Sequence, residues 1–254
     1  MSDDDPFTVD REGGVALVTL HDPARRNRLT PTVLHRFPAL LERTALDPAV
    51  RVVVLAGLPD VFCAGGDRDY LLRLATGERS ALESEPCVRA PLRCPVPVVA
   101  AMQGHAVGGG LLLGLFCDLA VFSERSVYHA NFLQYGFIPC MGATVLLPAR
   151  LGDVLGPEML LTARGYRGAE LRERGAGLRV TAHREVLPTA LAEARRMARA
   201  PRAALELMKK RLAAPLHAAT EAAIPEELAL MRQCFTDPAV RHRIQRLYPE
   251  GETK

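Results

Sequence analysis

Lysine is nearly absent from this sequence of 254 residues. Only Lys209, Lys210 and Lys254 occur among its 32 basic residues, and the rest are arginines. Because arginine keeps its proton in proteins, almost none of this positive charge can serve in acid/base chemistry. The 29 acidic residues leave a net charge of only +3. We therefore expect no nucleic-acid partner.

Long apolar runs are also missing. The longest, such as Leu111 to Phe116, fall far short of the roughly 20 residues needed to cross a membrane. The N-terminal segment MSDDDPFTVD is acidic and lacks the apolar stretch of a secretory signal. The six cysteines show neither CxxC nor metal-ligand spacing, which is typical of free thiols in a reducing compartment. We expect no membrane partner, no metal site and a cytoplasmic location.

Several catalytic motifs are absent as well. No GxGxxG follows a predicted strand and no GKS or GKT occurs, so dinucleotide and P-loop sites are excluded. The GxSxG nucleophile turn and the HExxH zinc motif are missing too. We therefore expect no cofactor.

The composition, with 48% hydrophobic and 24% charged residues, is that of a globular protein with a sizeable core. Short β-branched segments predict buried strands at residues 15–20, 51–56, 96–101 and 119–122. Thr30 and Pro31 predict the start of a helix that runs to about residue 45, with a kink or break at Pro38. Strands separated by helices at this spacing indicate an α/β fold around a largely parallel sheet.

After about residue 152 the sequence becomes rich in alanine, leucine, arginine and glutamate. Apolar residues at helical spacing predict helices at residues 157–162, 169–174, 186–198, 202–213 and 221–235. Pro201, Pro215 and Pro238 are expected to separate the later ones. We predict an α/β core at residues 1–200 and a helical region at residues 201–254, whose apolar faces pack on the core or on another subunit.

Two glycine-rich loops carry the chemistry. The first is FCAGGD at residues 62–67, and the second is QGHAVGGG at residues 103–110, which leads directly into an apolar helix. Glycines let a ligand approach the main chain, and a helix start leaves N–H donors free. The alternative for the GGG triplet is close packing of a helix against a strand. Two N–H groups that converge from separate loops would form an oxyanion hole.

In the order FCAGGD, QGHAVGGG, CDLAVFSE and GFIPCMGATVLLPARLG, the sequence resembles the crotonase (enoyl-CoA hydratase/isomerase) superfamily along nearly its whole length. The resemblance implies a spiral of ββα repeats with a helical trimerisation region, and hence a homotrimer. It also implies an acyl thioester substrate held beside Ala64, with Gly66 and Gly109 supplying the two oxyanion N–H groups. Leu112 and Phe132 stand where hydratases of the family carry glutamates, so we do not expect hydration.

The segments SVYHANFLQYGF, QGHAVGGGLLLGLF and GYRGAELRERG are similar to the second crotonase of polyketide β-branching cassettes. That resemblance implies decarboxylation of a 3-methylglutaconyl group on an acyl carrier protein, or on coenzyme A, through a dienolate held by the oxyanion hole. Those decarboxylases also use a lysine and a histidine. The expected lysine positions here hold Leu74 and Ser80, and the expected histidine position holds Met231.

Other residues are therefore candidates for binding the substrate carboxylate and for returning the proton. Arg73 and Arg79 could bind a substrate carboxylate, and Tyr70 could return a proton. The other substrate-binding candidates are Asp67, Tyr128, His129 and Phe132, although Asp67 could simply cap a helix and His129 could fill a polar gap on a strand.

Basic residues at two places could contact the carrier. Arg25 and Arg26 lie in the segment that resembles the family's edge loop, where a coenzyme A or pantetheine phosphate would pass. Residues 208–211 (MKKR) could meet an acidic carrier protein. Two other functions stay open: an enoyl thioester isomerase, and a non-catalytic crotonase that binds a carrier protein or a sister crotonase.

Overall fold

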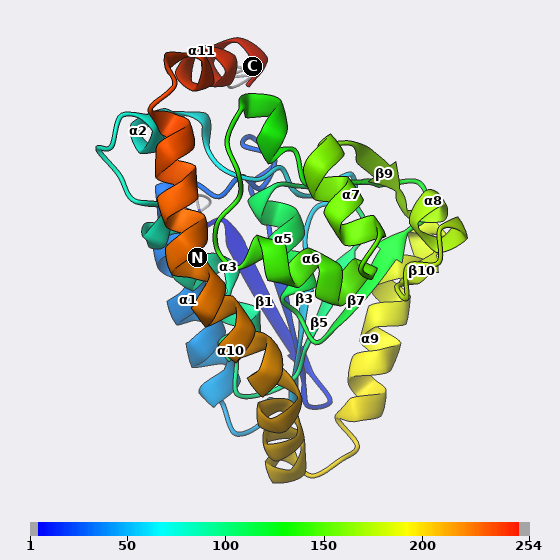
Figure 1. Cartoon of the computed structure of the whole chain (residues 1–254). Helices are drawn as coiled ribbons and strands as arrows, with labels where there is room; N and C mark the ends of the chain where they lie inside the picture. The colour runs from blue at the N-terminus through cyan, green and yellow to red at the C-terminus, as the bar shows by residue number, and fades with distance from the viewer. Residues whose placement is uncertain (1–4, 249–254) are drawn as a thin grey trace.

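Two β-sheets form the framework of the protein, whose computed structural model describes residues 5–248 (Figure 1). The larger sheet has the order β1-β2-β3-β5-β7-β10. Only β1 is antiparallel to its neighbour. Its strands are β1 (Phe7–Glu12), β2 (Val15–Leu20), β3 (Val52–Ala56), β5 (Val98–Met102), β7 (Leu119–Ser123) and β10 (Arg179–Thr181). The four strands predicted from sequence, and the largely parallel sheet, are confirmed.

The smaller sheet was not predicted from sequence, because its strands have only three residues each. These strands are β4 (Val61–Cys63), β6 (His105–Val107), β8 (Val127–His129) and β9 (Gly165–Arg167). The chain alternates between the sheets: β3, β5 and β7 of the larger sheet are followed by β4, β6 and β8 of the smaller one. This alternation, with helices after the strand pairs, confirms the expected spiral of ββα repeats.

The central strands are buried on both faces. Val52 and Val54 of β3 pack against α9 (Val186–Met197), which covers one face of the larger sheet. Val53 and Leu55 point to the opposite face and join the main core. Because side chains alternate along a strand, a continuous apolar run such as VVVLA is the pattern that a two-sided core needs.

The remaining helices cover the other face of the larger sheet and its ends (Figure 1). The α-helices are α1 (Pro31–Leu46), α2 (Arg68–Ala75), α3 (Glu85–Val88), α4 (Ala90–Arg93), α5 (Gly109–Leu115), α6 (Ala143–Leu151), α7 (Leu155–Thr162), α8 (Gly168–Glu173), α10 (Arg202–Phe235) and α11 (Pro238–Leu247). Short 3₁₀ turns occur at η1 (Ala81–Glu83), η2 (Phe132–Tyr135) and η3 (His183–Glu185). No helix within residues 5–248 is long and apolar enough to span a bilayer.

Two helix breaks expected at prolines do not occur, while a kink at Pro38 stays a prediction. Helix α1 continues through Pro38, since Leu34, Phe37 and Leu41 around it are packed in the core. The two helices expected on either side of Pro215 form the single helix α10, which also contains Pro225. Pro215 and Pro225 are both exposed, so water can satisfy the carbonyl groups that each proline deprives of a partner.

The C-terminal helices lie where a helical region was expected. Helix α10 crosses the front of the molecule, and α11 lies over its upper end beside α2 (Figure 1). The division at residue 201 stays a prediction, and residues 249–254 lie outside the described part of the chain.

Candidate active site

The first glycine loop follows β4 and turns sharply at Gly65. Gly65 has φ +87°, and a Cβ atom there would lie 2.6 Å from the Val107 carbonyl oxygen of the second loop. Only glycine meets both conditions. The Gly65 carbonyl accepts a hydrogen bond from the Leu29 N–H at 2.8 Å. No acceptor for the Gly66 N–H is found within residues 5–248.

The three glycines of the second loop do different work. Gly108 has φ +51° and turns the chain into α5. Gly110 packs the helix against β4, since a Cβ there would lie 2.4 Å from the Cys63 carbonyl oxygen. Gly109 lies between them at the first position of α5, where its N–H has no intrahelical partner. The packing interpretation of the triplet therefore holds for Gly110, and the free-donor interpretation holds for Gly109.

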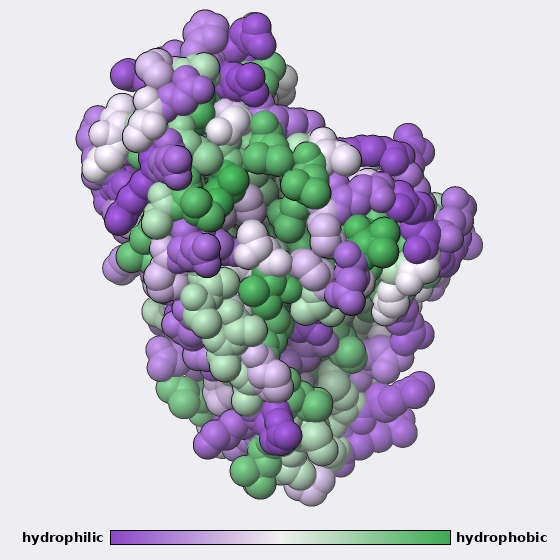
Figure 2. Space-filling view, in the orientation of Figure 1, coloured by the Kyte–Doolittle hydropathy of each residue, from purple (hydrophilic) through white to green (hydrophobic). Residues whose placement is uncertain are grey.

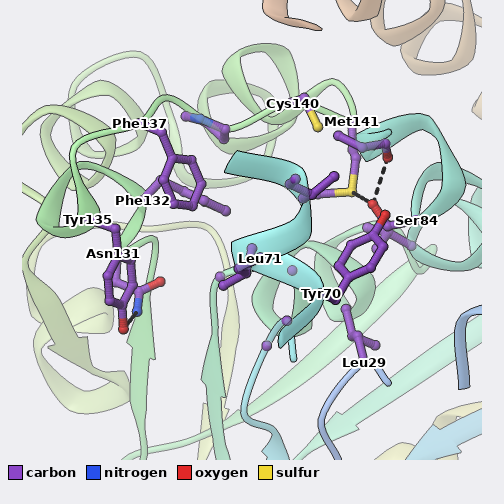
Figure 3. A pocket seen from close by; sticks show the side chains of 18 of the residues that line it. Leu29, Tyr70, Leu71, Ser84, Asn131, Phe132, Tyr135, Phe137, Cys140 and Met141 are labelled. Atoms are coloured by element: carbon purple, nitrogen blue, oxygen red, sulfur yellow. Dashed lines mark hydrogen bonds between the residues drawn. The ribbon is translucent and has the colours of Figure 1, made fainter. Parts of the chain in front are cut away.

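Gly66 and Gly109 line the same pocket, which is almost entirely apolar (Figure 3). Phe132, Tyr135 and Phe137 form one side of it. Tyr70, Ser84 and Met141 gather on the other side (Figure 3). The remaining lining residues are Leu29, Leu34, Ala64, Gly65, Leu71, Leu74, Ala81, Val88, Val107, Gly108, Asn131, Pro139, Cys140, Met231 and Tyr248. No charged side chain occurs among the described residues that line this pocket.

Tyr70 is placed in this pocket by α2. Asp67 accepts a hydrogen bond from the Tyr70 N–H at 3.1 Å, so its carboxylate caps the helix and does not line the pocket. The Tyr70 hydroxyl donates to the Ser80 carbonyl at 2.9 Å. Burial raises the pKa of Tyr70 to about 12. The phenol therefore keeps its proton at neutral pH.

Two of the three positions where the resemblance implies a lysine or a histidine line the pocket. Leu74 on α2 and Met231 on α10 both line the pocket. Both are buried, with 8% and 4% of their surface exposed. Ser80 lies just outside and contributes the carbonyl that holds Tyr70. The pocket therefore has apolar side chains at two places where the resemblance implies basic ones.

Tyr128 and His129 do not line this pocket. The Tyr128 hydroxyl is fully buried, donates to the Met102 carbonyl at 2.6 Å and accepts from the Ser123 N–H at 2.7 Å. A nitrogen of the His129 ring lies 2.7 Å from the Ala163 carbonyl, and burial lowers its pKa. Both residues therefore hold β8 in place, and their assignment to the substrate is corrected.

The arginines expected to bind substrate lie outside the pocket too. Arg79 is on the surface and pairs with Glu83 at 2.8 Å. Arg73 is exposed at the end of α2. Arg25 and Arg26 are exposed on the loop before α1, and Arg25 lies 3.5 Å from Asp22. In contrast, Ala64 and Phe132 do line the pocket, and their contact with substrate stays a prediction.

Two residues near the first glycine loop were not named as site candidates from sequence, although Arg28 lies in the predicted edge-loop segment at residues 22–29. Tyr248, which directly follows α11, donates a hydrogen bond to the Gly66 carbonyl, and its ring packs on Tyr135 at a tilt of 41°, with centroids 5.4 Å apart. The guanidinium of Arg28 lies 4.7 Å from the centre of the Tyr248 ring and is half-buried. Arg28 forms no ion pair with a carboxylate in the described part of the chain. The signal for Arg28 was the arginine-rich segment at residues 22–29, which resembles the family's edge loop. Tyr248 is 182 residues distant from Gly66, so no local pattern could link them.

The sequence matches the enoyl-CoA hydratase/isomerase family over residues 10–251, and the chain belongs to that family. It is 36% identical to the bacillaene synthase decarboxylase PksI of Bacillus subtilis over 240 residues, which are 94% of this chain and 96% of that protein. One similar solved structure belongs to a dehydratase/decarboxylase enzyme couple involved in polyketide β-branching, with a TM-score of 0.92, 36% identity and 96% of each chain covered. Another is the ECH2 decarboxylase domain of CurF from Lyngbya majuscula, with a TM-score of 0.89, 35% identity, and 96% of this chain and 99% of that chain covered.

Proposed function

We propose that this protein is a polyketide biosynthesis decarboxylase that acts on a 3-methylglutaconyl-type thioester carried by an acyl carrier protein. The observation that carries the proposal is the pocket shared by Gly66 and Gly109, whose N–H groups have no acceptor within residues 5–248, in a chain similar to known decarboxylases. We expect both N–H groups to bind one thioester oxygen.

The reaction needs these two donors more than it needs a base. The bond between the carboxylate carbon and the γ-carbon breaks, and carbon dioxide leaves. The electron pair passes through the conjugated system to the thioester oxygen, which becomes the oxyanion of a dienolate. The Gly66 and Gly109 amides stabilise that charge as it develops. One proton then returns to carbon.

An apolar wall can replace a cation in the first step. A carboxylate beside Leu74 and Met231 has lost its water and gained no ionic partner. Loss of carbon dioxide moves its charge from this apolar end to the N–H donors at the other end. The transition state is therefore favoured over the bound substrate by its surroundings.

Tyr70 is the group that we assign to the proton return. It is buried in the lining of the pocket, and its raised pKa keeps it protonated. Its hydrogen bond to the Ser80 carbonyl orients the phenol. A tyrosine in this setting donates a proton to a strong carbon base and regains it from water.

Charge at the outer side of the glycine loops supports a carrier protein as partner. Arg28 is half-buried at the mouth, where the pantetheine arm would leave the thioester. Burial lowers the pKa of His105, and the nearby Arg26, Arg125 and Arg167 lower it further against the opposing effect of Asp60, so three arginines lie around this surface. An acidic carrier protein with a phosphopantetheine arm complements this positive rim.

We also propose that the protein is a homotrimer. Helix α10 exposes Leu207 and Leu212, each with 70% of its surface accessible, and Met208 between them. Leu161 of α7 is also exposed. Figure 2 shows hydrophobic residues along the face that α10, α6 and α7 occupy in Figure 1. Light scattering is expected to give three times the mass of one chain, and a monomer at all concentrations would contradict it.

Mass spectrometry of a carrier protein loaded with 3-methylglutaconate tests the proposed reaction. Decarboxylation lowers the mass of the loaded carrier by about 44 Da, the mass of the carbon dioxide lost when the dienolate forms. An unchanged mass with a moved double bond, seen by ultraviolet absorbance, would instead identify an isomerase. If the loaded substrate stays unchanged while the carrier still binds, the protein is a non-catalytic binding protein. The apolar side chains of Leu74 and Met231, which cannot transfer protons, agree with that alternative.

A further inference from the structure

Helix α11 buries a single narrow face. Val240, Ile244 and Tyr248 are buried, with 3%, 0% and 6% of their surface exposed, while the residues between them are exposed. The three follow one another at intervals of four residues, so they share one face of the helix. Tyr248 continues this face past the end of α11, since its N–H still donates to the Ile244 carbonyl at 3.1 Å. The buried face of α11 therefore ends at the acyl pocket, which Tyr248 lines.

The Tyr248 side chain is held at both its ring and its hydroxyl. The ring contacts the Tyr135 ring and the Arg28 guanidinium, whose centres lie 5.4 Å and 4.7 Å from its own. Burial raises the pKa of Tyr248, so the hydroxyl keeps its proton at neutral pH and acts as a donor. Its acceptor is the Gly66 carbonyl. Tyr248 is thus a fixed donor to the loop that carries one of the two proposed oxyanion amides.

The two peptide groups on either side of Gly66 are held by different segments. The peptide between Gly65 and Gly66 is trans, so the Gly65 carbonyl and the Gly66 N–H point in opposite directions. The Leu29 N–H binds that carbonyl at 2.8 Å and so directs the Gly66 N–H away from the Leu29 main chain. The peptide between Gly66 and Asp67 carries the carbonyl that Tyr248 binds. The backbone angles of Gly66 are therefore set between Leu29 and Tyr248.

We propose that Tyr248 is a positioning residue of the oxyanion hole, which fixes the direction of the Gly66 N–H by holding the Gly66 carbonyl. This inference rests on the proposed function. Glycine has no Cβ atom, so rotation about the Gly66 backbone bonds is easy unless other groups prevent it. An oxyanion donor is effective when it is oriented before the charge develops. Tyr248 acts through Gly66 and exchanges no proton with the substrate.

A matched pair of tyrosine substitutions tests the proposal. Tyr248→Phe removes the hydroxyl and keeps the ring that contacts Tyr135 and Arg28. Tyr166→Phe is the control, because the Tyr166 hydroxyl donates to Glu158 at 2.6 Å on a fully buried residue that does not line the acyl pocket. Each variant loses one phenolic hydrogen bond. Thermal unfolding measures what that loss costs in stability, separately from activity.

We expect Tyr248→Phe to lower kcat for the loaded carrier by about three- to thirtyfold, which is less than the loss of an oxyanion donor itself. KM should stay within about twofold, because the interaction that is weakened develops in the transition state. Tyr166→Phe should leave both constants within about twofold. Equal losses of kcat in the two variants, or a change in KM alone for Tyr248→Phe, would overturn the proposal.

Infrared spectroscopy of a bound thioester separates this inference from the proposed reaction. An enoyl pantetheine thioester without a carboxylate cannot lose carbon dioxide, and a carbon-13 label isolates the stretching band of its thioester carbonyl. The natural protein should lower the frequency of this band relative to water, because two oriented N–H donors polarise the carbonyl. Tyr248→Phe should return the band part of the way, and Tyr166→Phe should not move it.

The two ways in which this experiment can fail are distinguishable. If the natural protein does not lower the frequency, the proposed oxyanion hole is wrong and this inference falls with it. If the natural protein lowers the frequency and Tyr248→Phe lowers it equally, the oxyanion hole stands and the positioning role of Tyr248 is overturned alone.

Discussion

The two walls of the acyl pocket are built differently. On one wall, the chemistry comes from backbone N–H groups of two loops that follow β4 and β6. On the other, it comes from side chains of α2, the segment after it and α10. The backbone wall keeps every glycine that its geometry needs, whereas the side-chain wall has the apolar Leu74 and Met231 at positions where the resemblance implies basic residues. Backbone donors are fixed by packing, while a side chain can be exchanged without disturbing the fold.

The contacts of the glycines explain why the first wall is so constrained. Gly65 and Gly110 each bring one chain segment against the backbone of another, at distances that no Cβ tolerates. Replacing either would move both loops, and with them both free N–H groups. At Leu74 or Met231, any side chain of similar volume can occupy the space. The side-chain wall is therefore the place where specificity can change.

Obstructing the backbone wall is expected to have the largest effect. A Cβ at Gly109 would lie 2.9 Å from Leu29 Cδ1, and the rest of a valine would fill the space beside the N–H. Gly109→Val should lower decarboxylation by at least about 10²- to 10³-fold, the usual cost of losing one oxyanion donor. Turnover of the loaded carrier, followed by mass spectrometry, measures it.

Gly66→Ala is the matched control for that variant. A Cβ at Gly66 would make only ordinary contacts of 3.5 Å with Leu71, and alanine keeps the N–H. Its activity should stay within about tenfold of the natural protein. Equal activity of Gly109→Val and the natural protein would show that the Gly109 donor is not used.

Changing the side-chain wall is expected to have an intermediate effect. Tyr70→Phe removes the phenolic proton and leaves the ring, so the rate should fall by about 10²-fold, the lower end of the usual contribution of a proton donor. The ratio of double-bond isomers in the product should change as well, since water would then supply the proton without positional control. Chromatography of the released acids reads that ratio, and an unaltered rate and ratio would remove Tyr70 from the mechanism.

The raised pKa of Tyr70 predicts that the rate of the natural protein stays constant at alkaline pH. An ordinary tyrosine loses its proton near pH 10 and could no longer donate it. With its pKa raised to about 12, Tyr70 stays protonated, so the rate should not fall between about pH 8 and pH 10.5 on its account. A loss of rate with a midpoint near pH 10 that persists in Tyr70→Phe would point to another group.

Substitution of Arg28, near the first glycine loop, is expected to have the smallest effect on activity. Arg28→Ala removes a half-buried cation at the mouth of the pocket, and KM for the loaded carrier should rise by about three- to tenfold with kcat nearly constant. Arg25→Ala, on the exposed part of the same loop, should change KM less. A pantetheine thioester without the phosphate should be insensitive to Arg28→Ala. Equal sensitivity of that small thioester would assign Arg28 to the acyl group.

The sequence by itself determined the framework and the backbone half of the site. Strands that are apolar at every position, such as β3 and β5, are recognisable because a two-sided core requires such runs. The glycine loops are recognisable because only glycine allows their turns and close approaches. Leu74 and Met231, which the resemblance singled out together with Ser80, line the pocket, and their roles stay a prediction.

Only the tertiary structure decided which side chains face the substrate. Tyr128 and His129 are next to pocket residues in sequence, yet their ring atoms bond to distant carbonyl groups of Met102 and Ala163. Lys209, expected at a carrier surface, is buried in an ion pair with Asp118 at 2.6 Å. The Tyr248 hydroxyl donates a hydrogen bond to the carbonyl of Gly66, which is 182 residues away in sequence. Such placements depend on contacts between segments remote in sequence, which neither local patterns nor helix and strand periodicity can encode.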